Sequence, residues 1–178
     1  MAGPRGDERA WIRGAQSGSV SDLEALFRHH WPRAYRAAYL VVHDSAAAED
    51  IAQEAFLAAV RGLDRFDRRR PFGPWLHRIV VNRAIDWSRA RALRRESGDT
   101  WLGLAEAPAP ANSEYAQTLA AALADLSPEH RAVIVMRHLL EYTPGEIAAA
   151  LGLPRGTVNS RLRRGLDELA GRLEEDPK

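Results

Sequence analysis

The residues best suited by type and spacing to bind a ligand lie in a C-terminal segment rich in arginine and small polar side chains. Arginine contacts DNA phosphates, and arginine, asparagine or serine hydrogen-bonds to base edges in the major groove. The candidate DNA-contacting residues are Arg155, Thr157, Asn159, Ser160, Arg161, Arg163 and Arg164. No acidic residue interrupts this stretch before Asp167. The same pattern also fits an ordinary helical hairpin with a solvated basic face.

Two expected helices would position these residues as a helix-turn-helix. Thr143 and Glu146 have the spacing of a capping box, and Pro144 suits the first helical position. Gly152 suits the left-handed residue that ends the first helix, and Pro154 begins the second. The buried stripe of the second helix is predicted to consist of Val158, Leu162, Leu166 and Leu169.

A second basic block covers residues 65–95, which contain ten arginines and two aspartates. The following residues, 96–130, contain six acidic residues and neither lysine nor arginine. The formal net charge of the whole chain is only +1. Two basic blocks separated by an acidic spacer indicate two distinct contacts with nucleic acid.

Aromatic residues lie among the arginines of the 65–95 block. Rings stack on bases while guanidinium groups contact phosphates, and this combination holds single-stranded nucleic acid. The helical spacing of three aromatic residues equally fits a hydrophobic core: Phe72, Trp75 and Trp87. Phe66 and the arginines remain candidates for contacts with nucleic acid. The polar residues that can line a pocket for an unstacked base are Asn82, Arg83 and Asp86.

An expected helix over about residues 46–63 carries an acidic face opposite an alanine-rich stripe. The acidic face consists of Asp50, Gln53, Glu54 and Leu57. Asp50 and Glu54 are like charges four positions apart, which destabilises an isolated helix. The helix dipole favours acids near the N-terminus, which explains Asp50 better than Glu54. The face fits either a docking site for a basic partner helix or a solvated surface.

Several functional classes are disfavoured by the sequence. It contains no HExxH, Walker-type loop or nucleophile elbow, so we expect no catalytic residue, no cofactor and no enzymatic activity. The chain has no cysteine, and the adjacent His29 and His30 point about 100° apart on a helix, so no metal site is expected. It has neither an apolar run of membrane-spanning length nor a signal core, which favours a cytoplasmic protein without membrane insertion.

Nearly every periodic stretch is helical, which predicts an all-α fold of two small helical domains joined by a flexible linker. Ser21 is expected to cap one helix, Pro32 to kink or split it, and Ser45 to cap the next. A third helix is expected from Phe72, either continuing through Trp87 or followed by a fourth. Three residues are unusual for a spacer and suggest that the linker docks on a surface: Trp101, Leu102 and Leu104.

Three motifs together resemble the extracytoplasmic-function (ECF, group 4) sigma factors of the bacterial sigma-70 family. They are AEDIAQEAF at 48–56, PFGPWLHRIVVNRAID at 71–86 and LSPEHRAVIVMR at 126–137, and the helix-turn-helix follows them. The resemblance covers about residues 20–170. It implies region 2 and region 4 joined by a linker. The domain limits are an N-terminal extension at 1–18, region 2 at 19–95, the linker at 96–114, region 4 at 115–172 and a tail at 173–178.

The resemblance also assigns roles to the residues singled out above. Residues Asp50, Gln53, Glu54 and Leu57 match the face that binds the β′ coiled coil of core RNA polymerase. The −10 element would be opened and read by Trp75, Arg78, Asn82, Arg83, Asp86, Arg89 and Arg91. Within that set, Asn82, Arg83 and Asp86 correspond to a loop that captures a flipped base. The helix from Pro154 would read the −35 element. Further implied partners are the polymerase β flap and an anti-sigma factor.

Two alternatives remain open, one within DNA binding and one from another class of protein. A stand-alone helix-turn-helix transcriptional regulator would dimerise and bind a palindromic site without polymerase, and it would leave the acidic face without a purpose. A small helical nuclease would need clustered carboxylates in a cleft to hold a divalent ion. The visible acids instead lie on a helix exterior or in the spacer.

Overall fold

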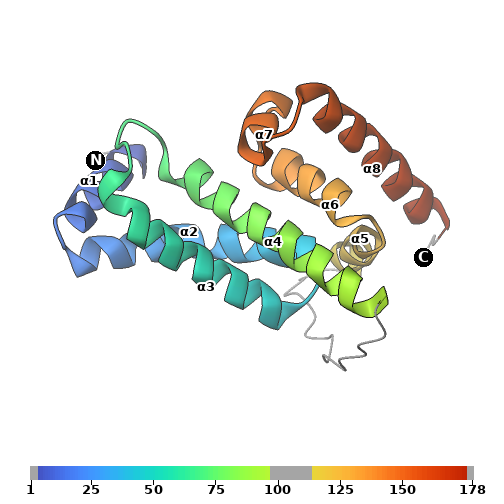
Figure 1. Ribbon diagram of the computed structural model, residues 1–178, viewed down its shortest axis with the longest axis horizontal. Helices are drawn as coiled ribbons and strands as arrows, with labels where there is room; N and C mark the ends of the chain where they lie inside the picture. The colour runs from blue at the N-terminus through green and yellow to red at the C-terminus, as the bar shows by residue number, and fades with distance from the viewer. Residues whose placement is uncertain (1–3, 97–113, 176–178) are drawn as a thin grey trace.

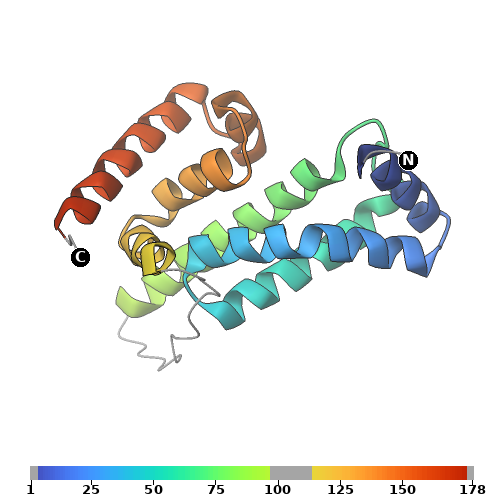
Figure 2. The same ribbon diagram turned by 180° about the vertical axis from the view of Figure 1, so that it is seen from behind.

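The chain is described by a computed structural model over residues 4–96 and 114–175, and within these ranges it folds into helices (Figure 1). The helices form two lobes that lie side by side: an N-terminal lobe, residues 4–96, and a C-terminal lobe, residues 114–175 (Figures 1 and 2). The all-α prediction is confirmed. The predicted linker, including Trp101, Leu102 and Leu104, lies almost wholly outside the described residues.

The N-terminal lobe is built from α1 (Pro4–Gln16), α2 (Val20–Val42), α3 (Ser45–Gly62), the short 3-10 helix η1 (Leu63–Arg65) and α4 (Phe72–Glu96). Helices α2, α3 and α4 pack against one another, and α1 lies across the end of α2 (Figure 2). Small side chains let the helices approach closely in this core. Its fully buried members include Ala34, Ala38, Val41, Ala48, Ala55, Leu76, Val80 and Val81.

Two helix starts differ by one or two residues from the sequence predictions. Helix α2 is capped by Ser19, whose hydroxyl accepts a hydrogen bond from the Asp22 amide at 3.3 Å, and not by Ser21. Helix α3 is capped by Asp44, whose carboxylate accepts from the Ala47 amide at 3.0 Å, and not by Ser45. In each case a second good capping residue stands just upstream of the predicted one.

The predicted split at Pro32 was wrong, because α2 runs without interruption from Val20 to Val42. Proline removes one backbone hydrogen bond, but α2 packs against α1, α3, α4 and the C-terminal lobe along its length. This packing stabilises the helix on both sides of Pro32.

Of the two alternatives for the helix that begins at Phe72, the continuous one is correct, since α4 is a single 25-residue helix.

The C-terminal lobe contains α5 (Glu114–Ala124), α6 (Pro128–Ile134), the π-helical turn η2 (Val135–Leu139), α7 (Pro144–Leu151) and α8 (Arg155–Glu175). The capping box of Thr143 and Glu146 is present, and Gly152 ends α7 with a φ of 65°. Helices α7 and α8 are therefore the predicted helix-turn-helix. Helix α8 extends three residues beyond the predicted end of its domain.

The buried stripe of α8 differs from the prediction at one position. Val158, Leu162 and Leu169 are buried, whereas Leu166 is 40% exposed. Gly165 occupies the crossing with α6 instead, where a Cβ atom would lie 3.0 Å from the Cδ1 of Ile134. The absence of a side chain at Gly165 lets the two helices approach each other closely.

Candidate functional site

The acidic surface of α3, defined as Asp50, Gln53, Glu54 and Leu57, is exposed to solvent at all four positions. Leu57 is 53% exposed, which is unusual for a large apolar side chain in a folded lobe. The Glu54 carboxylate accepts a hydrogen bond from Arg83 of α4 at 2.8 Å. The sequence therefore placed this surface correctly on one accessible face of a helix.

An apolar groove adjoins the acidic surface between α2 and α3. It has a volume of about 390 Å³ and shares Gln53 and Leu57 with that surface. Its other lining residues are Val20, Leu23, Glu24, Phe27, Phe56 and Val60. The acidic surface and the groove together form an amphipathic face that fits a helix with apolar and basic side chains.

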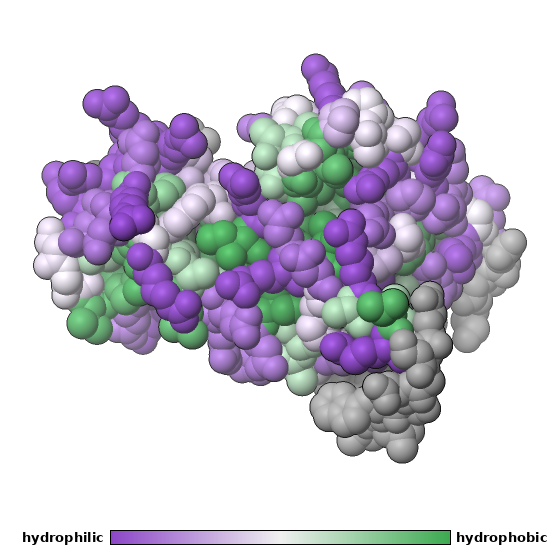
Figure 3. All heavy atoms as spheres, in the orientation of Figure 1, coloured by the Kyte–Doolittle hydropathy of each residue, from purple (hydrophilic) through white to green (hydrophobic). Residues whose placement is uncertain are grey.

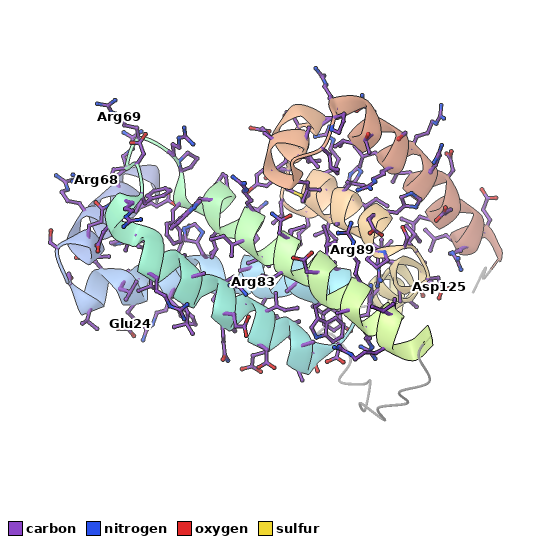
Figure 4. The ribbon with its side chains drawn as sticks, in the orientation of Figure 1. Glu24, Arg68, Arg69, Arg83, Arg89 and Asp125 are labelled. Atoms are coloured by element: carbon purple, nitrogen blue, oxygen red, sulfur yellow. The ribbon has the colours of Figure 1, made fainter. Side chains whose placement is uncertain are left out.

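The arginines predicted to contact the −10 element differ in their exposure and in whether they form ion pairs within the protein. Arg89 donates to the Glu129 carboxylate of α6 at 2.8 Å, and Arg91 pairs with Asp44 at 3.1 Å and lies over the Trp87 ring. Figure 4 shows Arg83 between α3 and α4, and Arg89 beside α6. Arg78 is exposed, whereas Trp75 is half-buried in an aromatic cluster.

The loop predicted to contain Asn82, Arg83 and Asp86 is not present, because all three residues lie in the middle of α4. They also face different neighbours. Asn82 donates to the carbonyl of Ala150 in α7 at 3.4 Å, whereas Arg83 points to Glu54 of α3. The apolar stripe of α4 continues through this segment as Val80, Val81, Ala84 and Ile85, which keeps it helical. Asn82 and Arg83 therefore face different neighbours and do not line one pocket together.

The nearest loop precedes α4 and carries three exposed arginines, Arg68, Arg69 and Arg70, and the exposed Arg65 ends η1 just before it. Figure 4 shows Arg68 and Arg69 projecting away from the lobe. An open cavity of about 680 Å³ lies beside this loop, and Figure 3 shows the outline hollowed between the two lobes. The lining comes from the loop, α4 and α7, and includes Arg65, Phe66, Arg70, Trp75, Arg78 and Glu146.

Helix α8 presents its cationic half to solvent. Arg155, Asn159, Arg163 and Arg164 are exposed, and Thr157, Ser160 and Arg161 are partly exposed. The Ser160 hydroxyl donates to the Thr157 carbonyl at 2.9 Å, which occupies its proton within the helix. The residues predicted for the −35 element therefore share an accessible helix surface.

Contacts between the lobes were missed by sequence reasoning. Arg33 of α2 donates to the carbonyl of Leu139 at 2.8 Å and to the Glu141 carboxylate at 3.1 Å. The His77 Nδ1 atom lies 2.9 Å from the Tyr142 hydroxyl. No local sequence pattern predicts these pairs, because the two residues of each pair are far apart in the chain.

Two histidines near this interface, the buried His77 and the partly buried His43, have lowered pKa values. Burial lowers the pKa of His77 to about 3, and the neighbouring His30 and Arg33 act in the same direction. Burial also lowers the pKa of His43 to about 4, helped by Arg131. The Nε2 atoms of both rings are buried and find no hydrogen-bond partner among the described residues. Both imidazoles are therefore neutral at physiological pH.

Among residues 4–96 and 114–175, no group of three or more histidine, aspartate or glutamate side chains is arranged to hold a metal ion. No helix within these ranges combines the length and apolar character that crossing a membrane requires.

Comparison with known protein families accounts for both lobes. The family model for Sigma-70 region 2 matches residues 26–94, and that for Sigma-70 region 4 matches residues 116–169. The chain is 34% identical to the ECF RNA polymerase sigma factor SigL of Mycobacterium tuberculosis, over 93% of this chain and 97% of that protein. The chain belongs to the ECF sigma factors of the sigma-70 family.

Other relatives of this sigma factor agree with that assignment. It is 30% identical to the ECF RNA polymerase sigma factor SigW of Bacillus subtilis, over 92% of this chain and 94% of that protein. It is 37% identical to SigE of Mycolicibacterium smegmatis over 85% of its own length, but it spans only 61% of SigE.

Solved structures of similar fold come from the same kind of protein. CnrH in complex with the cytosolic domain of CnrY matches with a TM-score of 0.69 and 30% identity, covering 96% of this chain and 99% of that chain. The sigma factor RpoE in complex with the anti-sigma factor NepR, from Bartonella quintana, matches with a TM-score of 0.71 and 26% identity, over 89% and 100%. In this sigma factor the region 2 match begins at residue 26, so α1 lies outside it.

Proposed function

We propose that this sigma factor binds core RNA polymerase in the cytoplasm and directs initiation at promoters that have particular −10 and −35 elements. The observation that carries the proposal is the presence of two exposed surfaces of opposite character on one chain. These are the acidic surface of α3 and the cationic half of α8. A stand-alone DNA-binding regulator would use only the second surface. The chain itself would supply recognition and leave the chemistry of RNA synthesis to its partner.

The acidic surface is the proposed docking site for the β′ coiled coil of the polymerase. Asp50 and Glu54 supply negative charge, and Leu57 supplies an exposed apolar contact beside the α2–α3 groove. Charge complementarity aligns the partner helix, and burial of the apolar groove stabilises the complex. We further propose that region 4 contacts the β flap.

Region 2 is proposed to extend over residues 19–95 and to open and hold the −10 element. Its candidate contacts remain Trp75, Arg78, Asn82, Arg83, Asp86, Arg89 and Arg91, to which the structure adds the arginines of the loop before α4. Guanidinium groups beside Phe66 and Trp75 offer phosphate contacts next to aromatic surfaces. Asn82 and Arg89 hold partners in the C-terminal lobe, so their use on DNA requires those contacts to open.

Region 4 is proposed to extend over residues 115–172 and to place α8 in the major groove of the −35 element. A helix-turn-helix presents the N-terminal part of its second helix to base edges. Arg155, Asn159, Arg163 and Arg164 lie in that part of α8 and are exposed. Each DNA contact surface is small, so tethering both regions to polymerase would raise their effective concentration and select promoters of matching spacing.

Replacing Arg164 with alanine is expected to weaken binding of the holoenzyme to its promoter by about 1–3 kcal/mol if Arg164 reads a base. The loss should fall on one position of the −35 element, measured with a series of single-base promoter variants. Arg172→Ala is the matched control, because Arg172 lies on the same helix but pairs with Asp125 at 2.8 Å. An equal loss on every sequence would instead make Arg164 a phosphate contact.

Run-off transcription with purified core polymerase and a genomic fragment library tests the function directly. The chain should stimulate specific transcripts, and their start sites should share two conserved elements at a fixed spacing. Transcription no greater than that of core polymerase alone would contradict the proposal. Tight, selective binding to promoter DNA by the chain without polymerase would favour the stand-alone regulator.

An anti-sigma factor is a further proposed partner. Support comes from RpoE of Bartonella quintana, which is similar to this chain and was solved with the anti-sigma factor NepR. Co-purification of the chain with a single small protein that blocks run-off transcription would identify such a partner. Full activity of the chain at every stage of purification from its host would argue against one.

A further inference from the structure

The N-terminal helix α1, which lies outside the region 2 match, is firmly docked on the N-terminal lobe. Ile12 is fully buried. The Glu8 carboxylate lies 2.9 Å from the Nε2 atom of His30 in α2, and both side chains are largely buried. Trp11 packs against the His29 ring with centroids 5.7 Å apart. These contacts hold the C-terminal end of α1 at a defined place.

The last residue of α1 reaches the segment where the chain leaves η1. The side-chain amide of Gln16 donates to the Leu63 carbonyl at 2.8 Å and to the Phe66 carbonyl at 3.0 Å. At Phe66 the backbone changes from helical to extended, with φ −71° and ψ 128°. One amide group therefore joins α1 to both sides of the point where the chain turns toward α4.

The arginine turn, residues 67–70, follows this point directly. Its own hydrogen bonds are local: the Arg69 amide donates to the Asp67 carboxylate and the Arg70 amide to the Asp67 carbonyl, both at 2.9 Å. On its N-terminal side the turn is anchored through Phe66, whose ring stacks on Trp75 with centroids 4.6 Å apart. The direction in which the turn projects therefore depends on how Phe66 is held.

The arginine turn borders the cavity between the lobes. Phe66, Arg70 and Trp75 line this cavity together with Arg78. The cavity thus combines aromatic surface with guanidinium groups, which is the chemistry that holds single-stranded nucleic acid.

We propose that Gln16 is a positioning residue: by holding the Leu63 and Phe66 carbonyls, it fixes the arginine turn where region 2 meets the separated −10 strand. The N-terminal helix thereby contributes to strand capture without touching DNA. This inference rests on the proposed promoter function for its DNA readout, and it has an independent readout in the free chain. A contact made through two rigid hydrogen bonds reduces the number of orientations that the turn samples before binding.

The test compares Gln16→Glu and Gln16→Met, which keep the length of the side chain but remove its N–H donors. The probe is a fluorescent single-stranded oligonucleotide carrying the non-template −10 sequence found by run-off transcription. Holoenzymes with either variant are expected to bind it about five- to thirty-fold more weakly, because neither side chain can form the two hydrogen bonds. Affinity for core polymerase and for a duplex −35 fragment should stay unchanged, since those surfaces lie elsewhere.

Ser17→Ala is the matched control, because Ser17 directly follows α1 and its hydroxyl bonds locally, to the Arg13 carbonyl. In the free chain, hydrogen exchange of the Phe66 and Arg70 amides should quicken in both Gln16 variants and not in Ser17→Ala. Unchanged hydrogen exchange of these two amides in the Gln16 variants would overturn the positioning role. An equal loss of affinity for the −10 oligonucleotide, the −35 fragment and core polymerase would also overturn it. Failure of the wild-type holoenzyme to bind the oligonucleotide would instead count against the proposed function, while the exchange result would still judge Gln16.

Discussion

Replacing Asp50 and Glu54 together with arginine is expected to abolish binding to core RNA polymerase while leaving the helical content unchanged. Both side chains are exposed, so the fold of the N-terminal lobe does not depend on them. The substitutions break the exposed ion pair of Glu54 with Arg83, and such pairs contribute about 0–1 kcal/mol to stability. Reversing two charges opposite a basic partner should weaken the complex at least about a hundred-fold.

The measurement is affinity for purified core polymerase, with circular dichroism to monitor folding. A control with the same change in net charge is Asp167→Arg combined with Glu174→Arg, because both residues are exposed on α8, far along the chain from α3. The control should bind core polymerase normally. Normal binding by the Asp50 and Glu54 variant would remove the acidic surface from the polymerase interface.

Lowering the pH from 7.5 to 5 is expected to destabilise the chain by about 4 kcal/mol through His43 and His77. Their folded pKa values, about 4 and about 3, lie below the ordinary value of 6.5. Their neutral forms therefore stabilise the fold fully above pH 6.5, and this contribution is lost as the pH falls toward 4 and then 3. Acidic groups with lowered pKa values, such as Glu129, act only below about pH 4.5.

Urea unfolding at the two pH values measures this effect. The double variant His43→Asn and His77→Gln should lose most of the difference, because neither new side chain gains a proton in this range. Asparagine tolerates the left-handed backbone at position 43, where φ is 51°. His138→Gln serves as the control, since His138 is exposed, and it should keep the full difference. An undiminished difference in the double variant would show that other groups bind the protons.

The features predicted correctly from the sequence depend on neighbours within a few residues. The capping box of Thr143 and Glu146 and the left-handed Gly152 are local features of the sequence. They mark the start and the end of α7, the first helix of the helix-turn-helix. The start of α2 was ambiguous because Ser19 and Ser21 have the same capping chemistry, and only the observed backbone distinguishes them. Local rules therefore identify the elements more surely than their ends.

The parts of the site that were not predicted depend on tertiary packing. Arg33 and Glu141 form an ion pair across 108 positions of the chain, and helical periodicity carries no information about such pairs. The continuity of α4 through Asn82 likewise follows from its buried stripe, whereas a resemblance to a base-capturing loop suggested otherwise. The loop that the structure shows is the arginine turn, and Gln16, about fifty residues upstream, donates to the Phe66 carbonyl next to it.

The hydrogen bonds and ion pairs that join the two lobes, here called the polar seam, respond to ionic strength. Its outer pairs, Arg89 with Glu129 and Arg33 with Glu141, involve exposed arginines, and their atoms lie 2.8 and 3.1 Å apart. Because these distances are well inside the Debye length of about 8 Å at physiological ionic strength, dissolved ions weaken the pairs only partly. The same ions compete with arginine for DNA phosphates. Salt therefore frees Arg89 only in part, while it weakens every arginine contact with phosphate. Affinity for promoter DNA should therefore fall steadily as the electrolyte concentration rises, with Arg89 offsetting only a small part of the loss.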